Sequence, residues 1–367
     1  MKQYKQTYPG NSLKQIKNRS CRKILPFFLM LAVLNLISLT VCHAQFLWKI
    51  NGEMGYFNSS APGFAEDHDI LSRLDAQLKY QYSGEEKQAL FTFRVRPEFY
   101  GFDNKIGTVK FRLSGDYLQD EENFSWGLNL SAQRLEFRDA AYSSGSESFV
   151  IAGVVNIWAD TLPLSLIPGY AYQLQKSDPL QDQDMDIIFL EANLSRYFSN
   201  YFEMNYGAYL EYFSITDHKS FMPSEPRLTS AGGWRAGPQL GLRYVKDFIA
   251  EGSYRFLLHN SKETEFPSFE HHLKLLAGKM LLSRFSAFIF VNYYYRGLKN
   301  RKDAKTAPIF LYTPVNSENT IYLKLGYDLS STIESYIKYG YANENLFYKE
   351  FSLKGWSLLF GIELNGL

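Results

Sequence analysis

The sequence predicts an all-β protein: a single antiparallel β-barrel of about sixteen strands that crosses a membrane. Three observations lead to this prediction. Aromatic residues make up 17% of the 367-residue chain, yet its mean hydropathy is −0.26 and it has one long apolar run, near the N-terminus. Segments of strict two-residue alternation extend from Phe46 to the C-terminus. In the second half of the chain, very short connections alternate with long ones, as in barrels that cross a membrane.

Residues 1–44 are predicted to be a cleavable signal peptide. Seven basic residues and no acidic residue lie in this segment, and the basic cluster precedes an apolar run at 24–41. Cys42 and Ala44 then place small residues at the two positions that signal peptidase reads. The mature chain would begin at Gln45, so residues 45–367 would form the barrel.

Two other interpretations of the leader stay open. An uncleaved membrane anchor is disfavoured by the polar residues Asn35, Ser38 and Thr40 inside the apolar run. A lipid anchor on Cys42 is disfavoured by Val41, because Gly, Ala or Ser is expected before the modified cysteine.

Cleavage would change the charge and the chemistry of the chain. The leader holds seven of the 39 basic residues and none of the 38 acidic ones, so the net charge would change from +1 to −6. A nucleic-acid partner is therefore not expected. Both cysteines, Cys21 and Cys42, would leave with the leader. The mature chain would then have no disulfide, no thiolate metal site and no cysteine nucleophile.

The alternating segments predict strands with one apolar and one polar face. In the clearest segment, apolar residues occupy every second position from Ile321 to Leu329, with Lys324 and Asp328 among the residues between them. Such segments run to roughly 10 to 14 residues, whereas strands of soluble proteins average about 5 to 6. A tilted strand needs about 9 to 11 residues to cross a bilayer. Their length therefore favours a membrane barrel over a soluble sandwich.

The predicted strands are sixteen, and an even count places both termini on the periplasmic side. They lie at 46–57, 70–82, 89–101, 107–118, 124–136, 148–158, 164–175, 185–197, 201–214, 232–245, 248–258, 268–280, 284–296, 319–329, 332–343 and 350–364. The alternation is weakest between 137 and 184, so fourteen strands is the alternative count.

Charged residues recur on the predicted inward face, where a dry core would not tolerate them unpaired. The candidate basic residues are Arg73, Arg94, Arg96 and Arg112, and the candidate acidic residues are Glu191, Glu203, Glu211 and Glu251. On a sixteen-stranded cylinder the two groups would lie roughly opposite each other. They could create a selectivity field across a water-filled lumen. The alternative is that paired charges fill and brace the lumen.

No residue pattern predicts a catalytic, metal or cofactor site. The His-x-Ser pairs at His259 and His218 fall where loops are predicted. His271 and His272 are adjacent, so they cannot share one strand face as metal ligands. The acidic run at 182–186 resembles the start of a calcium loop but lacks the required glycine, and it is interpreted as a solvated acidic loop.

The leader, the alternating faces, the turn asymmetry and the terminal strand together resemble those of outer-membrane β-barrel proteins, broadly the porin-like ones. The Ala44-Gln45 junction is similar to leader ends of Bacteroidota. The resemblance implies a place in the outer membrane of a Gram-negative cell, with membrane lipid, lipopolysaccharide and the barrel assembly machinery as partners. It implies no cofactor.

Three functions follow from this resemblance and from the predicted lumen. The first is a porin-like passive channel for small hydrophilic solutes, because barrels of 16 to 18 strands leave an aqueous pore. The second is a non-conducting barrel that docks to a secretion or surface-assembly complex through loops such as 215–231 and 297–318. The third, a lipid-modifying enzyme, would need catalytic groups converging at the outer rim, which the sequence does not supply.

Overall fold

The computed structural model describes ten stretches of the chain. They are 44–60, 68–101, 106–138, 143–158, 163–177, 181–217, 230–261, 268–298, 319–345 and 352–366. No helix in these stretches is long and apolar enough to cross a membrane. The leader prediction for residues 1–44 falls almost wholly outside them.

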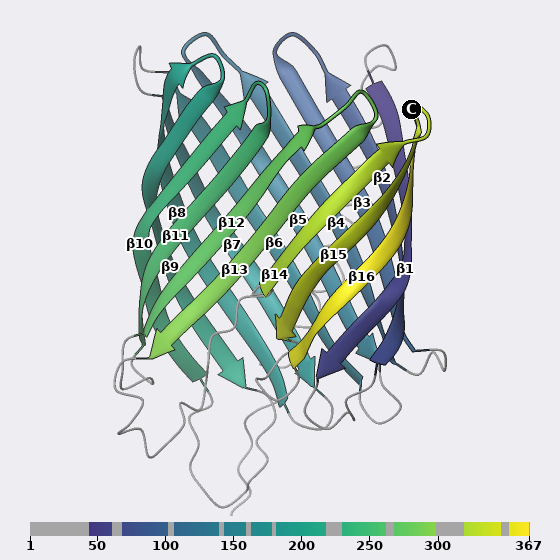
Figure 1. Cartoon of the computed structure of the whole chain (residues 1–367). Helices are drawn as coiled ribbons and strands as arrows, with labels where there is room; N and C mark the ends of the chain where they lie inside the picture. Colours follow the sequence, from purple (N-terminus) through teal and green to yellow (C-terminus); the bar gives the residue numbers. More distant parts are fainter. Residues whose placement is uncertain are drawn as a thin grey trace, which may run out of the picture. The chain divides into compact units, whose positions relative to one another are not determined.

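The described residues form sixteen strands. Their bounds are β1 Ala44–Ser60, β2 His68–Ser83, β3 Lys87–Tyr100, β4 Ile106–Asp120, β5 Phe124–Arg138, β6 Ser143–Ile157, β7 Leu164–Ser177, β8 Gln181–Ser199, β9 Phe202–Asp217, β10 Ser230–Val245, β11 Ile249–Ser261, β12 Ser268–Met280, β13 Phe285–Leu298, β14 Asn319–Asp328, β15 Ile333–Asn345 and β16 Ser352–Gly366. Each strand pairs with its neighbours in sequence, and β1 pairs antiparallel with β16, with Met54 opposite Phe360. The sheet thus closes into the barrel seen in Figure 1.

This architecture confirms the predicted closed antiparallel barrel of sixteen strands, and the count of fourteen is wrong. Two strands begin four to five residues earlier than predicted: β6 at Ser143 rather than 148, and β8 at Gln181 rather than 185. Both extensions are polar on both faces, in Ser143–Glu147 and Gln181–Asp184. Hydrophobic alternation cannot detect a strand end that continues beyond the apolar part of the barrel.

The tight turns of the described residues lie at one end of the barrel, which we call the turn end. They are 84–86, 121–123, 200–201, 246–248, 281–284 and 329–332. Backbone hydrogen bonds close them, such as Glu121 N to Phe124 O at 2.8 Å and Leu329 N to Ile333 O at 2.9 Å. The strand β1 begins and β16 ends at the same end (Figure 1). We call the other end of the barrel the loop end.

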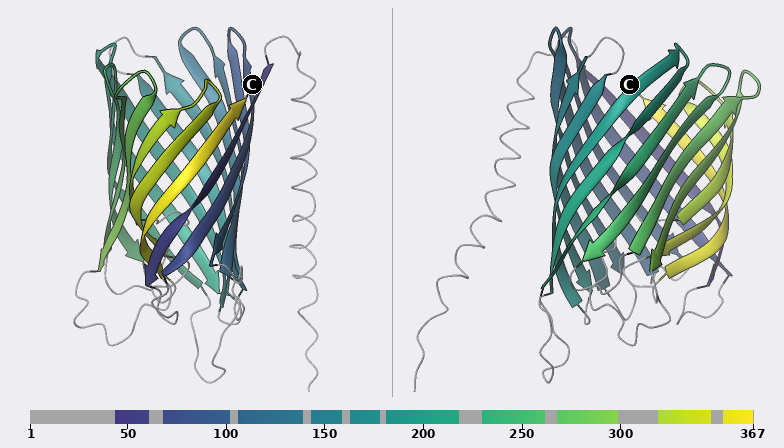
Figure 2. Two further views of the ribbon diagram at one scale, coloured as in Figure 1. Left: turned by 45° about the vertical axis from the view of Figure 1, so that its right-hand side comes forward. Right: turned by 90° about the vertical axis from the view of Figure 1, so that its left-hand side faces the viewer.

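The outward face of the barrel is apolar on strands around its whole circumference. Figure 2 shows these strands from two further sides. Alternate residues of each strand point outward, and large apolar side chains at these positions are exposed. Examples from six strands are Met54, Leu78, Leu113, Ile188, Leu323 and Phe360. Soluble monomers rarely expose a contiguous apolar surface of this extent. The outward face therefore needs an apolar surrounding.

Two small apolar clusters lie on the inward face, which was predicted to be polar. Met185, Ile187, Phe213 and Ile215 form one cluster on β8 and β9, toward the loop end. Phe57, Leu71 and Leu359 form the other on β1, β2 and β16. All seven side chains are buried. The inward face is therefore polar over much of its surface but apolar at these two places near the loop end.

Candidate functional site

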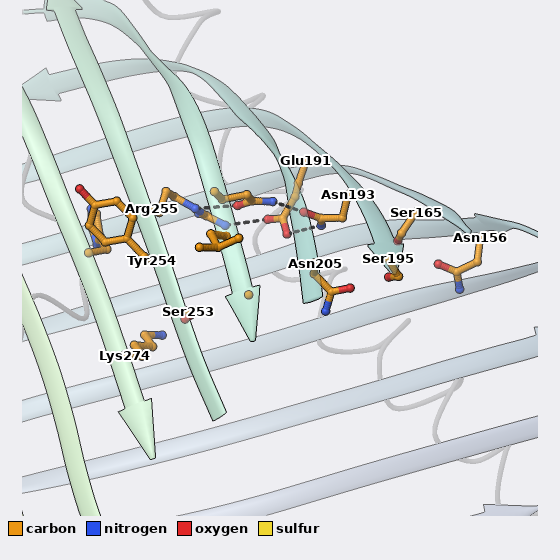
Figure 3. Close-up of a pocket in the computed structure, with 14 residues that line it drawn as sticks. Asn156, Ser165, Glu191, Asn193, Ser195, Asn205, Ser253, Tyr254, Arg255 and Lys274 are labelled. Atoms are coloured by element: carbon orange, nitrogen blue, oxygen red, sulfur yellow. Dashed lines mark hydrogen bonds and ion pairs between the residues drawn. The ribbon is translucent and has the colours of Figure 1, made fainter. Parts of the chain in front are cut away.

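The inward faces of the strands carry two hydrogen-bonded charge networks, and strand alternation explains which residues can join them. The first network lies where β1 closes the barrel, between β15 and β3. The second lies on β8, β10 and β11, across the barrel. Figure 3 shows part of the second network and the cavity beside it.

The first network is a chain of alternating charges that we call the seam network: Lys338, Glu53, Arg73, Glu98 and Arg96. Lys338 Nζ lies 3.0 Å from Glu53, and Arg73 Nη1 lies 2.8 Å from the same carboxylate. Arg73 Nε and Arg96 Nε lie 2.8 and 2.9 Å from Oε1 of Glu98. The chain connects β15, β1, β2 and β3, so it spans the closure of the barrel.

Neutral side chains donate further hydrogen bonds to the two carboxylates of the seam network. Tyr336 OH donates to Glu53 at 2.8 Å, and Tyr100 OH and Thr108 Oγ1 donate to Glu98 at 2.9 and 3.1 Å. Tyr336 passes over Gly361 of β16, where an added Cβ would lie 2.2 Å from the tyrosine ring. Glu98 has no solvent exposure, so its charge depends entirely on these partners.

The second network is a closed ring of four side chains, which we call the amide ring. Arg255 Nη2 donates to Glu191 at 2.8 Å, and Arg255 Nε donates to Gln239 at 2.9 Å. Gln239 Nε2 donates to Asn193 at 2.5 Å, and Asn193 Nδ2 donates back to Glu191 at 2.8 Å. The Arg255 guanidinium also lies 4.1 Å from the centre of the Tyr209 ring. These contacts fix the orientation of all four polar groups.

A buried charge cluster lies on the loop-end side of the amide ring. Arg235 contacts Glu211 at 3.5 Å and Glu270 at 3.2 Å. His259 and His272 lie 3.6 and 3.5 Å from the Glu270 carboxylate. Arg235, Glu211, Glu270 and His259 are all buried. These four side chains are therefore shielded from solvent, whereas His272 at the edge of the cluster is 26% exposed.

A polar cavity of about 580 Å³ lies on the turn-end side of the amide ring, against β6 to β12. Amides and hydroxyls supply much of its lining, including Asn156, Ser165, Ser195, Asn205 and Ser253. Of the side chains labelled in Figure 3, the inward-facing ones come from several neighbouring strands and border this space, whereas Tyr254 points outward. Glu191, Arg255, His272 and Lys274 are the titratable side chains that line it.

The predicted basic residues differ in their partners. Arg73 and Arg96 belong to the seam network, and Arg94 pairs with Asp75, with Nε 2.7 Å from the carboxylate. Arg112 is exposed on the same face and forms no ion pair with any described residue. Its role and that of Arg94 in ion selection stay predictions.

The predicted acidic residues also differ in their partners and in their exposure. Glu191 pairs with Arg255 and Glu211 with Arg235. Glu251 pairs with Arg243 at 3.2 Å, with side chains that are 46% and 60% exposed. Glu203 lies opposite Arg243 in the register of β9 and β10. The turn-end half of this wall therefore carries solvated charges, whereas the half toward the loop end carries buried ones.

The histidine pairs and the acidic run noted in the sequence form no metal-binding group among the described residues. His259 lies within β11 rather than in a loop, and it contacts Glu270; His218 lies outside the described residues. His272 faces the lumen while His271 packs against the outward-facing Tyr254, with 2.7 Å between Tyr254 Oη and His271 Nδ1. The acidic run at 182–186 is part of β8, so its interpretation as a loop is wrong. No group of metal-ligating side chains occurs among the described residues.

No protein-family model matches the sequence, and no curated protein matches it. Solved structures that align with most of the chain at low identity include the following three. The outer membrane channel DcaP of Acinetobacter baumannii has a TM-score of 0.49 and 11% identity, over 89% of this chain and 99% of its own. CdiB from Acinetobacter baumannii has a TM-score of 0.47 and 8% identity. The alignment covers 88% of this chain and 60% of the CdiB chain. OprB of Pseudomonas putida has a TM-score of 0.42 and 9% identity. The alignment covers 88% of this chain and 94% of the OprB chain.

Sequence reasoning missed Asn193, Gln239, Lys274 and Lys338 as lumen residues of interest. Asn193, Gln239 and Lys338 form the contacts described above, and Lys274 lines the cavity. The two-residue alternation could have found them, because it places each of them on the inward face of its strand. Alternation does not show which side chains contact each other across strands, and it gave no reason to select the uncharged amides Asn193 and Gln239.

Proposed function

We propose that this protein is a porin-like channel of the outer membrane, which lets small hydrophilic solutes pass through its charged lumen. The membrane part of the proposal is supported by the apolar outward face on a closed barrel. A closed barrel satisfies all its strand hydrogen bonds internally, which lipid requires. The exposed apolar side chains would then face lipid.

The observation that carries the channel proposal is the solvent-accessible, polar interior of the turn-end half. A cavity of about 580 Å³ lies there, and exposed charged side chains such as Arg112, Arg243 and Glu251 share the same inward face. Charged side chains remain solvated only where water reaches them. A water-filled interior bordered by fixed charges is the arrangement that outer-membrane channels use.

The orientation follows from the proposal. The turn end would face the periplasm and the loop end the cell exterior, as short turns and long loops do in bacterial barrels. Residues 1–44 would direct export, and the barrel assembly machinery and lipopolysaccharide would be the partners of insertion.

The test of this proposal is the effect of Arg112→Glu on ion selectivity. Arg112 lies on the lumen face opposite Arg94, is exposed, and has no ion pair with a described residue. A charge beside a permeating ion acts with about 1 kcal/mol at 4 Å in water. The substitution should therefore shift the permeability ratio toward cations by up to about fivefold, measured as the reversal potential in a salt gradient.

The matched control is Lys279→Glu, which makes the same charge reversal on the outward face of β12 near the turn end. It should leave the reversal potential unchanged. Equal shifts from both variants, or no shift from Arg112→Glu in a conducting protein, would refute a lumen bordered by Arg112.

A second function, a non-conducting barrel that docks to a secretion or surface-assembly complex, is favoured by a different observation. Glu98, Glu211 and Glu270 are buried on the lumen wall, and apolar side chains cluster on the same face near the loop end. A lumen closed at that level would not conduct. The loops proposed for docking, at 215–231 and 297–318, lie mostly outside the described residues.

A further inference from the structure

The cavity beside the amide ring carries an inference about the kind of solute, which rests on the proposed channel function. Its volume of about 580 Å³ is within the range of about 300 to 1,000 Å³ that small-molecule sites occupy. Its walls come from several strands of one rigid sheet, and the amide ring holds one side of it in place. The cavity is thus preformed, as a binding site requires.

The charges around the cavity balance. Glu191, Arg255 and Lys274 line it. Arg243 lies two residues beyond the lining residue Gly241, in register with Glu203 and Glu251, so three carboxylates and three cations surround the cavity. Glu191 and Glu251 are each paired with one of these cations. A solute ion of either sign would therefore gain little from the net field of this wall, while a neutral polar solute loses nothing by it.

The hydrogen-bonding groups of the cavity suit hydroxyl groups. Glu191, Asn193, Gln239 and Arg255 use one or two of their donors or acceptors in the amide ring, and their planar groups have further capacity. Donors and acceptors therefore stand side by side and are fixed in direction. Neighbouring hydroxyls of a sugar, each of which donates and accepts, are complementary to such a surface.

Asn205 adds an independent observation. Its Oδ1 atom is buried at the cavity wall, and no described residue donates a hydrogen bond to it. A buried acceptor without a donor costs free energy, and a turn of the Asn205 amide that brings Oδ1 to the cavity surface would let a bound solute donate to it. Sugar hydroxyls supply such donors.

We propose that this cavity is a binding site for a neutral, polyhydroxylated solute of the size of a mono- or disaccharide. The amide ring orients the donors and acceptors, and Asn205 and Ser253, which flank Gly241 in register on β9 and β11, contact the solute from the same wall. The site would hold the solute on the turn-end side of the buried charge cluster.

The test is saturation-transfer NMR on the folded, detergent-solubilised protein, with maltose as the neutral sugar, gluconate as the anion and glycine betaine as the zwitterion. Maltose should receive saturation and titrate with a measurable Kd, and the other two should receive far less. Asn205→Leu removes the amide at nearly constant volume and should raise the Kd for maltose about fivefold to tenfold. Ser253→Val, which leaves the amide ring intact, is the second variant in case Asn205→Leu does not fold.

The matched control is Gln81→Leu, which removes an exposed lumen-facing amide of β2, outside the cavity lining. It should bind maltose as the unmodified protein does. Stronger transfer to gluconate or betaine than to maltose would overturn the proposal, as would unchanged maltose binding in the folded Asn205 and Ser253 variants. Because binding is read without a membrane, loss of the sugar site in a conducting protein contradicts this inference alone. Sugar binding in a protein that does not conduct contradicts only the channel.

Discussion

Leu113→Arg should prevent stable insertion of the barrel into lipid, whereas Ser114→Arg should be tolerated. The two residues are adjacent in the middle of β4, and alternation directs Leu113 outward and Ser114 into the lumen. An arginine at mid-membrane depth on the lipid face costs about 2 to 4 kcal/mol. An arginine at 114 would lie between Arg112 and Asp116, which are both exposed on the lumen face.

The measurement is the folded fraction in liposomes, followed by heat-modifiable gel mobility over a urea titration. The free energy of unfolding should fall by the stated amount for Leu113→Arg and by less than about 1 kcal/mol for Ser114→Arg. Similar losses for both variants would show that the two faces of β4 do not face lipid and water respectively.

Arg73→Leu should destabilise the barrel by about 3 to 5 kcal/mol, because it removes the cation that contacts both Glu53 and Glu98. Both carboxylates are buried, and the loss of a partner leaves their charge in a poorly solvated place. The effect should include the closure of the barrel, since Glu53 lies on β1 and also binds Lys338 of β15.

The matched control is Arg243→Leu. Arg243 pairs with Glu251, but both side chains are largely exposed, so the loss should be about 0 to 1 kcal/mol. Unfolding in urea, followed by tryptophan fluorescence in detergent, gives both values. Equal stability of the two variants would contradict the assignment of the seam network as a structural brace.

The sequence predicted the strands well because membrane-facing strands repeat one simple pattern. Period-two alternation placed all sixteen strands and put Arg73, Arg94, Arg96 and Arg112 on one face. The strand ends at Ser143 and Gln181 escaped prediction because polar side chains occupy both faces there. The inward cluster around Phe213 escaped because alternation identifies two faces but cannot say that both are apolar.

The partners of the lumen charges could not be predicted, because they depend on register between strands. Arg73 meets Glu98 through the register of β2 and β3, which one turn sets. Its other partner, Glu53, also meets Lys338, which lies 285 residues away in the sequence. That contact exists only because the barrel closes. Analysis of the strands one at a time cannot predict such a contact. The same holds for the amide ring, whose members come from β8, β10 and β11.

Single-channel recording of the purified, folded protein in a planar lipid bilayer tests the central claim most directly. The cavity and the solvated charges of the turn-end half predict discrete conductance steps whose size falls when Ser253→Trp narrows the lumen beside the amide ring. Heat-modifiable mobility of the same preparation shows that it is folded. A folded barrel that inserts into the bilayer and carries no current would contradict the channel and support the non-conducting barrel instead.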